Sequence, residues 1–165
     1  MGEKNIMSMT DDVFCEIYNK YKNTVYSVIF NYLKNIDDTA DLQQEVFIRL
    51  YQANVDFESN EHLKAWLIRV SINLCNNYCR SSRHKANVPL SEEIPYFDMN
   101  HGNELLSVVL SLPEKYRIPL HLFYYEDYTI KQISDVLNIP ENTIKVRLKR
   151  GREKLIKILN KEDWF

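Results

Sequence analysis

Apolar residues recur every three or four positions along most of the chain, which is the period of an α-helix that buries one face. In the first half, this spacing predicts amphipathic helices over residues 11–34, 38–53 and 63–83. Thr10, which precedes two aspartates, suits the N-cap of the first helix. Residues 54–62 are polar and have no period, so we expect a loop there. The residues predicted to face inward on the second and third helices are Val46, Phe47, Leu50, Tyr51, Leu63, Trp66, Leu67, Val70, Leu74 and Tyr78.

The helical pattern stops over residues 86–103, where two prolines, a glycine and scattered polar residues are typical of a linker. This stretch is too long for a tight turn and too polar for a core element. We therefore predict an all-α fold of two small helical domains, over residues 8–85 and 104–162, joined by the linker.

In the second half the helices are shorter and their ends are marked by specific residues. Pro113 separates a helix that starts near Leu105 from one that continues to about Tyr124. Thr129 and Gln132 form a capping-box pattern, which predicts the start of another short helix. A break over residues 138–140 follows, and Pro140 suits the first position of the last helix.

Composition narrows the class of protein. The 165 residues are 45% hydrophobic and 27% charged, which is the balance of a soluble folded chain. Three glycines and five prolines argue against a turn-rich all-β fold and against low-complexity disorder. No apolar run approaches the ~18 residues of a transmembrane helix, and the first ten residues lack the features of a secretory signal. Three cysteines make no disulfide framework, so we expect a reducing, cytoplasmic setting. The lack of a long apolar run predicts no membrane insertion.

The net charge of −2 conceals a segregation of charge along the chain. Residues 144–157 carry seven lysines and arginines and a single acidic residue. A concentrated positive charge of this kind favours contact with phosphate groups, whatever the mean charge of the protein. The simplest competing interpretation is a solvated basic helix face.

The basic segment follows a short capped helix and a three- to four-residue break, which is the layout of a helix-turn-helix. Such a helix fits the major groove of DNA, where Lys and Arg reach guanine edges and phosphates. We expect the first turn of this helix to enter the groove, with the neighbouring cations on its outer face and flanks. The predicted DNA-contacting residues are Glu141, Asn142, Thr143, Lys145, Val146, Arg147, Lys149, Arg150 and Lys154, and Arg152 shares the outer face with Lys145 and Lys149.

Two further groups of polar residues lie in the first half. Asp38, Asp41, Leu42 and Glu45 form an acidic stripe, which is either a protein-binding face or a solvated helix face. The second group combines aromatic residues with amides and arginines, which can stack on unpaired bases and read base edges. Taken alone, Asn73 has a structural hydrogen bond as an equal alternative, and core packing is the preferred role of Trp66. The second group comprises Phe57, Ser59, Asn60, His62, Arg69, Asn73, Asn76, Asn77 and Arg80.

Together these segments resemble a known family. Residues 37–51 resemble the core-binding segment of region two in sigma-70-class initiation factors, and residues 63–74 resemble their helix that recognises the −10 element. Residues 112–117, 125–129 and 143–155 resemble region four. Only these two regions are present, joined by a short linker, which is the layout of the extracytoplasmic-function (ECF) subfamily.

The resemblance implies an alternative sigma factor that binds core RNA polymerase and directs initiation at promoters with −10 and −35 elements. The residues 55–62 with Asn73 would receive a flipped base of the −10 strand, and the last helix would read the −35 duplex. An anti-sigma factor, possibly membrane-anchored, is a further implied partner. The residues that match the polymerase contact are Asp41, Leu42, Gln44 and Glu45, to which Asp38 is added from the acidic stripe.

Other classes find less support. The four histidines stand alone and there is no glycine-rich phosphate loop, so the sequence indicates no enzyme and no cofactor. Cys75 and Cys79 with His84 suggest a metal or redox site, but buried cysteines without a ligand role are favoured. The main rival is a stand-alone helix-turn-helix regulator, which binds duplex DNA unaided and usually as a dimer.

Overall fold

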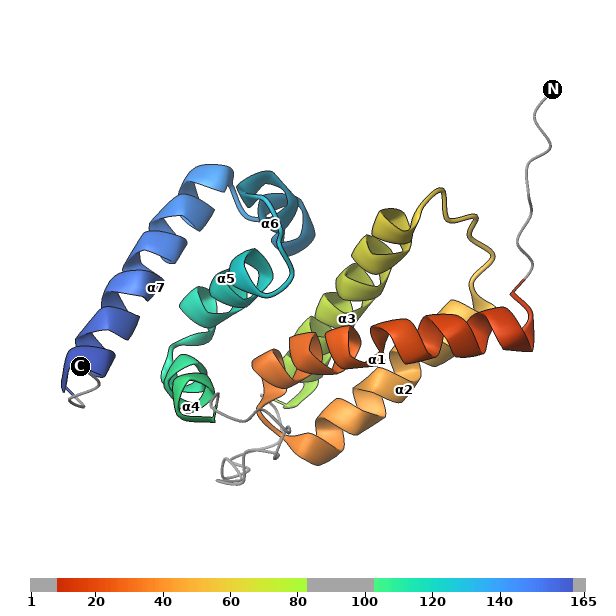
Figure 1. Cartoon of the computed structure of the whole chain (residues 1–165), viewed down its shortest axis with the longest axis horizontal. Coiled ribbons are helices and arrows are strands. Elements are labelled where there is room, and N and C mark those ends of the chain that lie inside the picture. Colours follow the sequence, from red (N-terminus) through yellow and green to blue (C-terminus); the bar gives the residue numbers. More distant parts are fainter. Residues whose placement is uncertain (1–8, 83–102, 162–165) are drawn as a thin grey trace. The chain divides into compact units, whose positions relative to one another are not determined.

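The computed structural model describes residues 9–82 and 103–161, and in these residues the chain forms helices and no strand (Figure 1). The predicted all-α fold is confirmed in the described part of the chain. The helices are α1 (Asp11–Leu33), α2 (Ile36–Gln52), α3 (Asn60–Ser82), α4 (Asn103–Ser111), α5 (Glu114–Tyr124), α6 (Ile130–Leu137) and α7 (Glu141–Lys161).

The described residues divide into two compact units. The first unit holds residues 9–29 and 37–82, and the second holds residues 103–161 together with the short stretch 30–36. Of the predicted linker, only Asn103 lies within the described residues.

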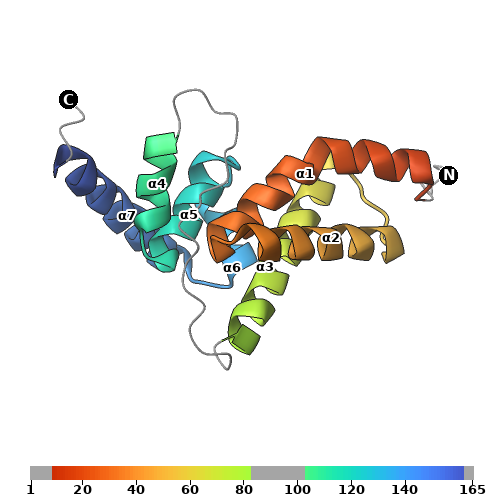
Figure 2. The ribbon, with the colours of Figure 1, turned by 90° about the horizontal axis from the view of Figure 1, so that it is seen from below.

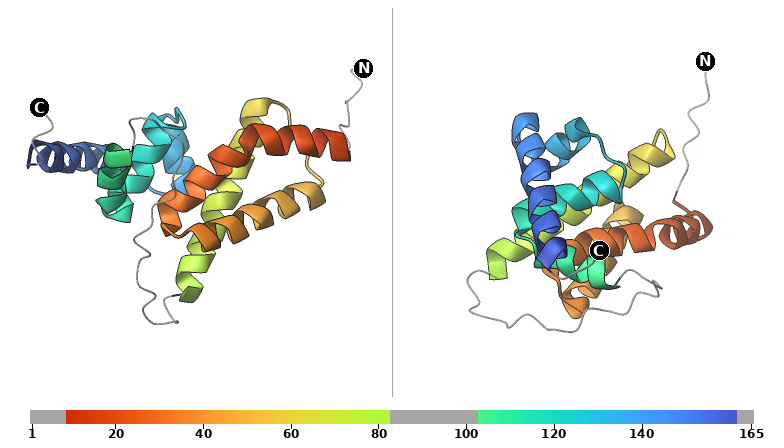
Figure 3. Two further views of the ribbon diagram at one scale, coloured as in Figure 1. Left: turned by 60° about the horizontal axis from the view of Figure 1, so that its bottom comes forward. Right: turned by 60° about the vertical axis from the view of Figure 1, so that its left-hand side comes forward.

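In the first unit, α1 and α2 run antiparallel and α3 crosses both of them (Figures 2 and 3). Their shared core includes Val25, Leu50, Leu67 and Ile68, each with no exposed surface. Hydrogen bonds also join the helices, as the Gln43 side chain of α2 donates to a backbone carbonyl of α1 over 2.7 Å. The three helices are thus held by burial of their apolar faces and by bonds between them.

The second unit is built around α5, which packs against both α6 and α7, while α4 also contacts α7. Ile133, Ile144 and Leu148 are buried where α6 meets α7. A side chain on Gly151 would place its Cβ 2.8 Å from Leu120 Cδ1 and 3.3 Å from Tyr116 Cβ. The absence of a side chain at this position therefore lets α7 approach α5 closely.

Several local predictions differ from the structure. The third helix begins at Asn60 and not at residue 63, because Ser59 Oγ accepts a hydrogen bond from the backbone N–H of His62 and caps it. Pro140 lies just before α7, where its carbonyl accepts a bond from the N–H of Ile144.

The predicted inner stripes are also partly wrong. Tyr51 is 51% exposed, because its hydroxyl reaches out to donate a hydrogen bond to Asp11 Oδ1 over 3.1 Å. Trp66, Val70 and Tyr78 are half-buried, and Ile68 and Ile72 occupy the α3 core beside Leu67.

Candidate nucleic-acid and protein interfaces

The α6–α7 pair has the geometry of a helix-turn-helix. The predicted capping box is present, since the Thr129 hydroxyl accepts from the N–H of Gln132 and the Gln132 side chain accepts from the N–H of Thr129. Asn138 ends α6 in the left-handed conformation (φ 54°), which asparagine tolerates better than most residues. The Ser134 hydroxyl donates to the carbonyl of Ile139 over 2.5 Å, which ties the turn to α6. These contacts fix the direction in which α7 leaves the turn.

The outer face of α7 carries the predicted DNA-contacting residues. Ile144, Leu148 and Gly151 are buried on the opposite side, and most of the charged positions between them are exposed. Val146 is 46% exposed among the cations, where a methyl-bearing side chain could contact a thymine methyl group. Of the predicted residues, Thr143 and Arg147 are half-buried, and the exposed ones are Glu141, Asn142, Lys145, Val146, Lys149, Arg150 and Lys154.

Two tyrosines of α5 hold cations of α7, a feature that the sequence analysis missed. Arg152 Nη1 donates to the Tyr124 hydroxyl over 3.2 Å. On the other edge of α7, Lys154 Nζ lies 5.7 Å from the centre of the Tyr116 ring, and Arg150 is one of the cations that lower the pKa of that phenol. No helical period links α5 to α7, so no pattern in the sequence pointed to these pairs.

The acidic stripe of α2 forms one surface, but its members differ in their surroundings. Asp41 and Gln44 are exposed, and Leu42 is half-buried. Glu45 forms an ion pair with Arg49, with 2.8 Å between Oε1 and Nε. The cation lowers the net negative charge that Glu45 presents to a partner.

Asp38 has a structural contact besides its place in this stripe. Its Oδ2 accepts a hydrogen bond of 2.6 Å from the Tyr78 hydroxyl of α3. This hydrogen bond, followed by burial, raises the pKa of Tyr78 to about 12. Asp38 thus fastens α2 to α3, whatever else it binds.

The predicted base-binding residues fall into two groups. At the start of α3, Phe57 makes edge-to-face contacts with His62 and Trp66, at centroid distances of 5.5 and 5.7 Å. Ser59 and Asn60 belong to the same corner, and with Phe57 they line a cavity of about 660 Å³ between the 53–60 segment and the first half of α1. The second group is an exposed stripe along α3, and it consists of Arg69, Asn73, Asn76, Asn77 and Arg80.

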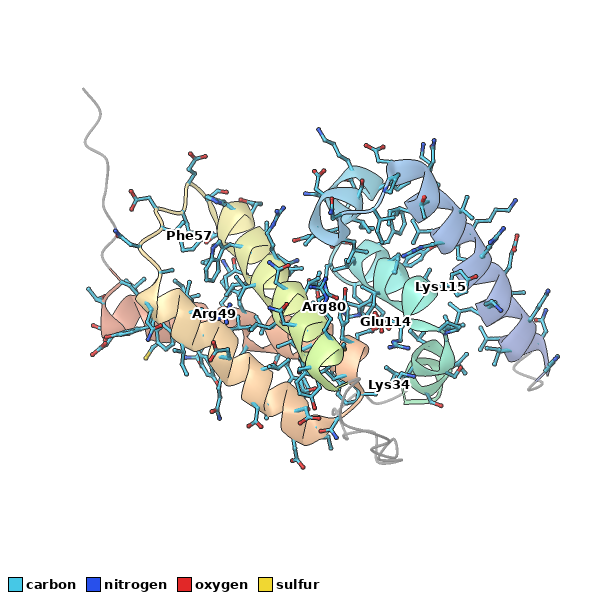
Figure 4. All side chains as sticks on the ribbon, turned by 180° about the vertical axis from the view of Figure 1, so that it is seen from behind. Lys34, Arg49, Phe57, Arg80, Glu114 and Lys115 are labelled. Carbon is cyan, nitrogen blue, oxygen red and sulfur yellow. The ribbon has the colours of Figure 1, made fainter. Side chains whose placement is uncertain are left out.

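Asn73 lies about two turns along α3 from Trp66 and does not line the cavity. Figure 4 labels Phe57, in the segment before α3, and Arg80, near the far end of that helix. The assignment of both groups to one base-binding site stays a prediction.

The cysteines of α3 and an apolar groove complete the description of the first unit. Cys75 is buried and Cys79 is half-buried on α3, and His84 lies outside the described residues. An apolar groove of about 440 Å³ between α1 and α2, which the sequence analysis missed, is lined mainly by Phe14, Tyr18, Phe47, Ile48 and Tyr51.

Across residues 9–82 and 103–161, no helix combines the length and the hydropathy needed to span a membrane.

Comparison with known proteins defines the class. Residues 17–85 match the family model "Sigma-70 region 2", and residues 102–155 match "Sigma-70, region 4". The chain thus has the two segments of a sigma-70-class protein, of which the second contains the α6–α7 helix-turn-helix.

Full-length relatives identify the family. The chain is 30% identical to the ECF RNA polymerase sigma factor SigW of Bacillus subtilis, over 94% of both chains. It is also 30% identical to SigM of the same bacterium, over 88% of this chain and 94% of the relative. The chain belongs to the ECF RNA polymerase sigma factors, and it is an alternative sigma factor that directs transcription initiation.

Solved structures share the fold. The sigma factor RpoE from Bartonella quintana, crystallised with the anti-sigma factor NepR, superposes with a TM-score of 0.74 at 19% identity, over 92% of this chain and 98% of that one. CnrH, in complex with the cytosolic domain of CnrY, superposes with a TM-score of 0.66 at 18% identity, over 94% and 93% of the two chains.

Proposed function

We propose that α7 reads the −35 element of promoter duplexes. The observation that carries this proposal is the helix-turn-helix geometry, in which an exposed cationic face stands opposite a fully buried apolar one. Lys145 and Lys149, one turn apart, are assigned to the groove floor with Asn142 and Thr143. A cation at this place donates to guanine O6 and N7, so it discriminates among sequences.

We propose that the first unit binds the −10 element as a single DNA strand. The aromatic corner formed by Phe57, His62 and Trp66 provides faces on which an unpaired base can stack. The exposed amides and arginines of α3, from Arg69 to Arg80, would contact the DNA strand where it continues beyond this corner. Ser59 would act there indirectly, since its hydroxyl caps α3.

Core RNA polymerase is proposed to bind the acidic face of α2. Asp41 and Gln44 are exposed on it, and Leu42 adds an apolar contact at its centre. An acidic helix face with an apolar centre suits a basic, partly apolar helical surface on the partner. Asp38 and Glu45 would contribute less than Asp41, because Tyr78 and Arg49 already engage them.

The remaining assignments complete the proposal. The chain would work in the cytoplasm as two domains, residues 8–85 and 104–162, joined by the linker 86–103, and it would act by binding and not by catalysis. An anti-sigma factor would hold it inactive by covering the polymerase- and DNA-binding faces. The structure of the sigma factor RpoE with the anti-sigma factor NepR, and that of CnrH with the cytosolic domain of CnrY, support this expectation.

Run-off transcription tests the proposal directly. Purified core polymerase is mixed with this protein on fragments of the host genome, and transcripts are compared with those from core polymerase alone. New transcripts with defined start sites are expected only when both proteins are present. A stand-alone regulator would instead bind duplex fragments unaided, as a dimer, and would add no transcripts to core polymerase.

A further inference from the structure

Tyr116 lies where α5 and α7 approach most closely. It is 7% exposed, and its Cβ would lie 3.3 Å from a Cβ built on Gly151. The glycine therefore leaves room for the tyrosine, whose ring stands beside the 150–154 turn of α7. This contact sets the position of the phenol relative to the cations of that turn.

Three cations surround this phenol. The Nζ atoms of Lys115 and Lys154 lie 5.0 and 5.7 Å from the ring centre, and the charges of Lys115 and Arg150 lower the pKa of the phenol. Lys115 belongs to α5 and is labelled in Figure 4, whereas Arg150 and Lys154 are one turn apart on α7. One aromatic side chain thus gathers cations from two helices.

The electrostatics of the cluster point to an anion. Burial raises the pKa of Tyr116, but Lys115 and Arg150 outweigh burial and hold this pKa below its ordinary value. The phenol oxygen therefore lies in a positive potential. Three positive charges around one ring repel each other, and a bound anion would relieve that repulsion.

We infer that Tyr116 is a positioning residue, whose hydroxyl and ring hold Arg150, together with Lys115 and Lys154, to bind a backbone phosphate of the DNA that α7 enters. This inference rests on the proposed binding of duplex DNA by α7. The outward face of a helix in the groove meets base edges, and its flanks meet the sugar–phosphate backbone. Because Arg150 lies one turn from Lys154, which contacts the Tyr116 ring, we place it in the phosphate-binding set and not in the base-reading set.

The test measures binding of the full chain, assembled with core RNA polymerase, to a fluorescent promoter duplex by anisotropy, between about 50 and 200 mM salt. The variants are Tyr116→Phe, which keeps the ring and removes the hydroxyl, Arg150→Ala, and the two combined. Tyr125→Phe is the matched control, since it makes the same change at an exposed tyrosine that stacks on His121. Thermal unfolding followed by circular dichroism verifies that each variant is folded.

We expect Tyr116→Phe to weaken binding about fivefold for every duplex sequence, which is the scale of one lost hydrogen bond to a charged group. Arg150→Ala should make the salt dependence shallower by about one unit of slope. The combined variant should lose less affinity than the two single losses multiplied together, because the tyrosine acts in part through the arginine. Lys115→Ala, at an exposed position, should reduce the slope in the same way.

Other outcomes overturn the inference. If Tyr116→Phe binds DNA with wild-type affinity, Tyr116 does not position the cations. If adding Tyr116→Phe to Arg150→Ala weakens binding by the same factor as it does in the wild-type chain, Tyr116 does not act through Arg150. If the wild-type chain binds and Lys149→Ala weakens it while Tyr116→Phe has no effect, only the role of Tyr116 is wrong. If the wild-type chain assembled with core polymerase shows no salt-dependent binding, the proposed function of α7 fails as well.

Discussion

The acidic face of α2 and the basic face of α7 use the same side chain in opposite ways. At the α2 face, the carboxylate of Asp38 accepts a hydrogen bond from the hydroxyl of Tyr78, which belongs to α3. At the α7 face, the hydroxyl of Tyr124 accepts a hydrogen bond from Arg152, and the phenol of Tyr116 lies beside Lys154 in a positive potential. In each unit, a tyrosine from a neighbouring helix holds a charged side chain of the proposed binding surface.

The pKa shifts of the two phenols record this difference. The hydrogen bond to a carboxylate raises the pKa of Tyr78 to about 12, because it stabilises the protonated phenol. Cations lower the pKa of Tyr116 in spite of its burial, because they stabilise the phenolate. A tyrosine can therefore position either sign of charge, since its hydroxyl is both donor and acceptor.

Charge reversal on α2 should have the largest effect. Asp41→Lys combined with Glu45→Lys replaces two carboxylates by cations on the proposed polymerase-binding face, and the second change also removes the anionic partner of Arg49. We expect pull-down of core polymerase to be abolished while the helical circular-dichroism spectrum is kept.

The matched control reverses two exposed acids of α1 at the same spacing, Asp12→Lys with Glu16→Lys, and should keep the polymerase. Retention of polymerase by the folded α2 variant would show that the acidic face is not the contact.

Lys149 and Lys154 should differ in the kind of loss that they cause. Lys149→Ala removes a proposed base contact, so it should cost about 1–3 kcal/mol and relax the preference at one −35 position. Lys154→Ala removes a phosphate contact, so it should weaken all promoters about equally. Transcription from a library of −35 sequences measures both. If Lys154→Ala changes the preferred sequence and Lys149→Ala only lowers activity, the placement of α7 in the groove is wrong.

Gly151→Ala tests the close approach of α5 and α7. Alanine normally favours a helix by about 1 kcal/mol over glycine, but here its Cβ would press on Leu120 and Tyr116. Overpacking costs about 1–3 kcal/mol, so we expect a net loss of stability of about 1 kcal/mol in urea unfolding. A more stable variant would show that the two helices can separate at no cost.

Tyr78→Phe should give the smallest effect, and it depends on pH. At neutral pH we expect a loss of about 1 kcal/mol, because Asp38 loses its donor. The pKa of Tyr78 is higher in the folded protein (about 12) than its ordinary value of 10.0, so its contribution is complete below pH 10 and is lost as the pH rises toward 12. Urea unfolding of both chains across this range should show the difference shrinking, and a constant difference would assign it to lost packing.

Much of this protein follows from short-range patterns in its sequence. The period of apolar residues predicted α1, α2 and α3 to within a few residues, and the capping box at Thr129 was found as expected. The segments that resemble sigma-70 regions two and four are contiguous, and residues 17–85 and 102–155 match those families. These features were readable because helical periodicity, caps and motifs depend on residues within a few positions of one another.

Only the tertiary structure decided which charged side chains are held by a tyrosine of another helix. Tyr78 and Asp38 are 40 positions apart, and Tyr116 meets Arg150 only because Gly151 lets two helices approach closely. Likewise Tyr51, which the helical period directed inward, lies exposed because its hydroxyl finds Asp11 on another helix. A helical period gives the face of a helix on which a side chain lies, but its partner on another helix is set by packing between segments distant in sequence.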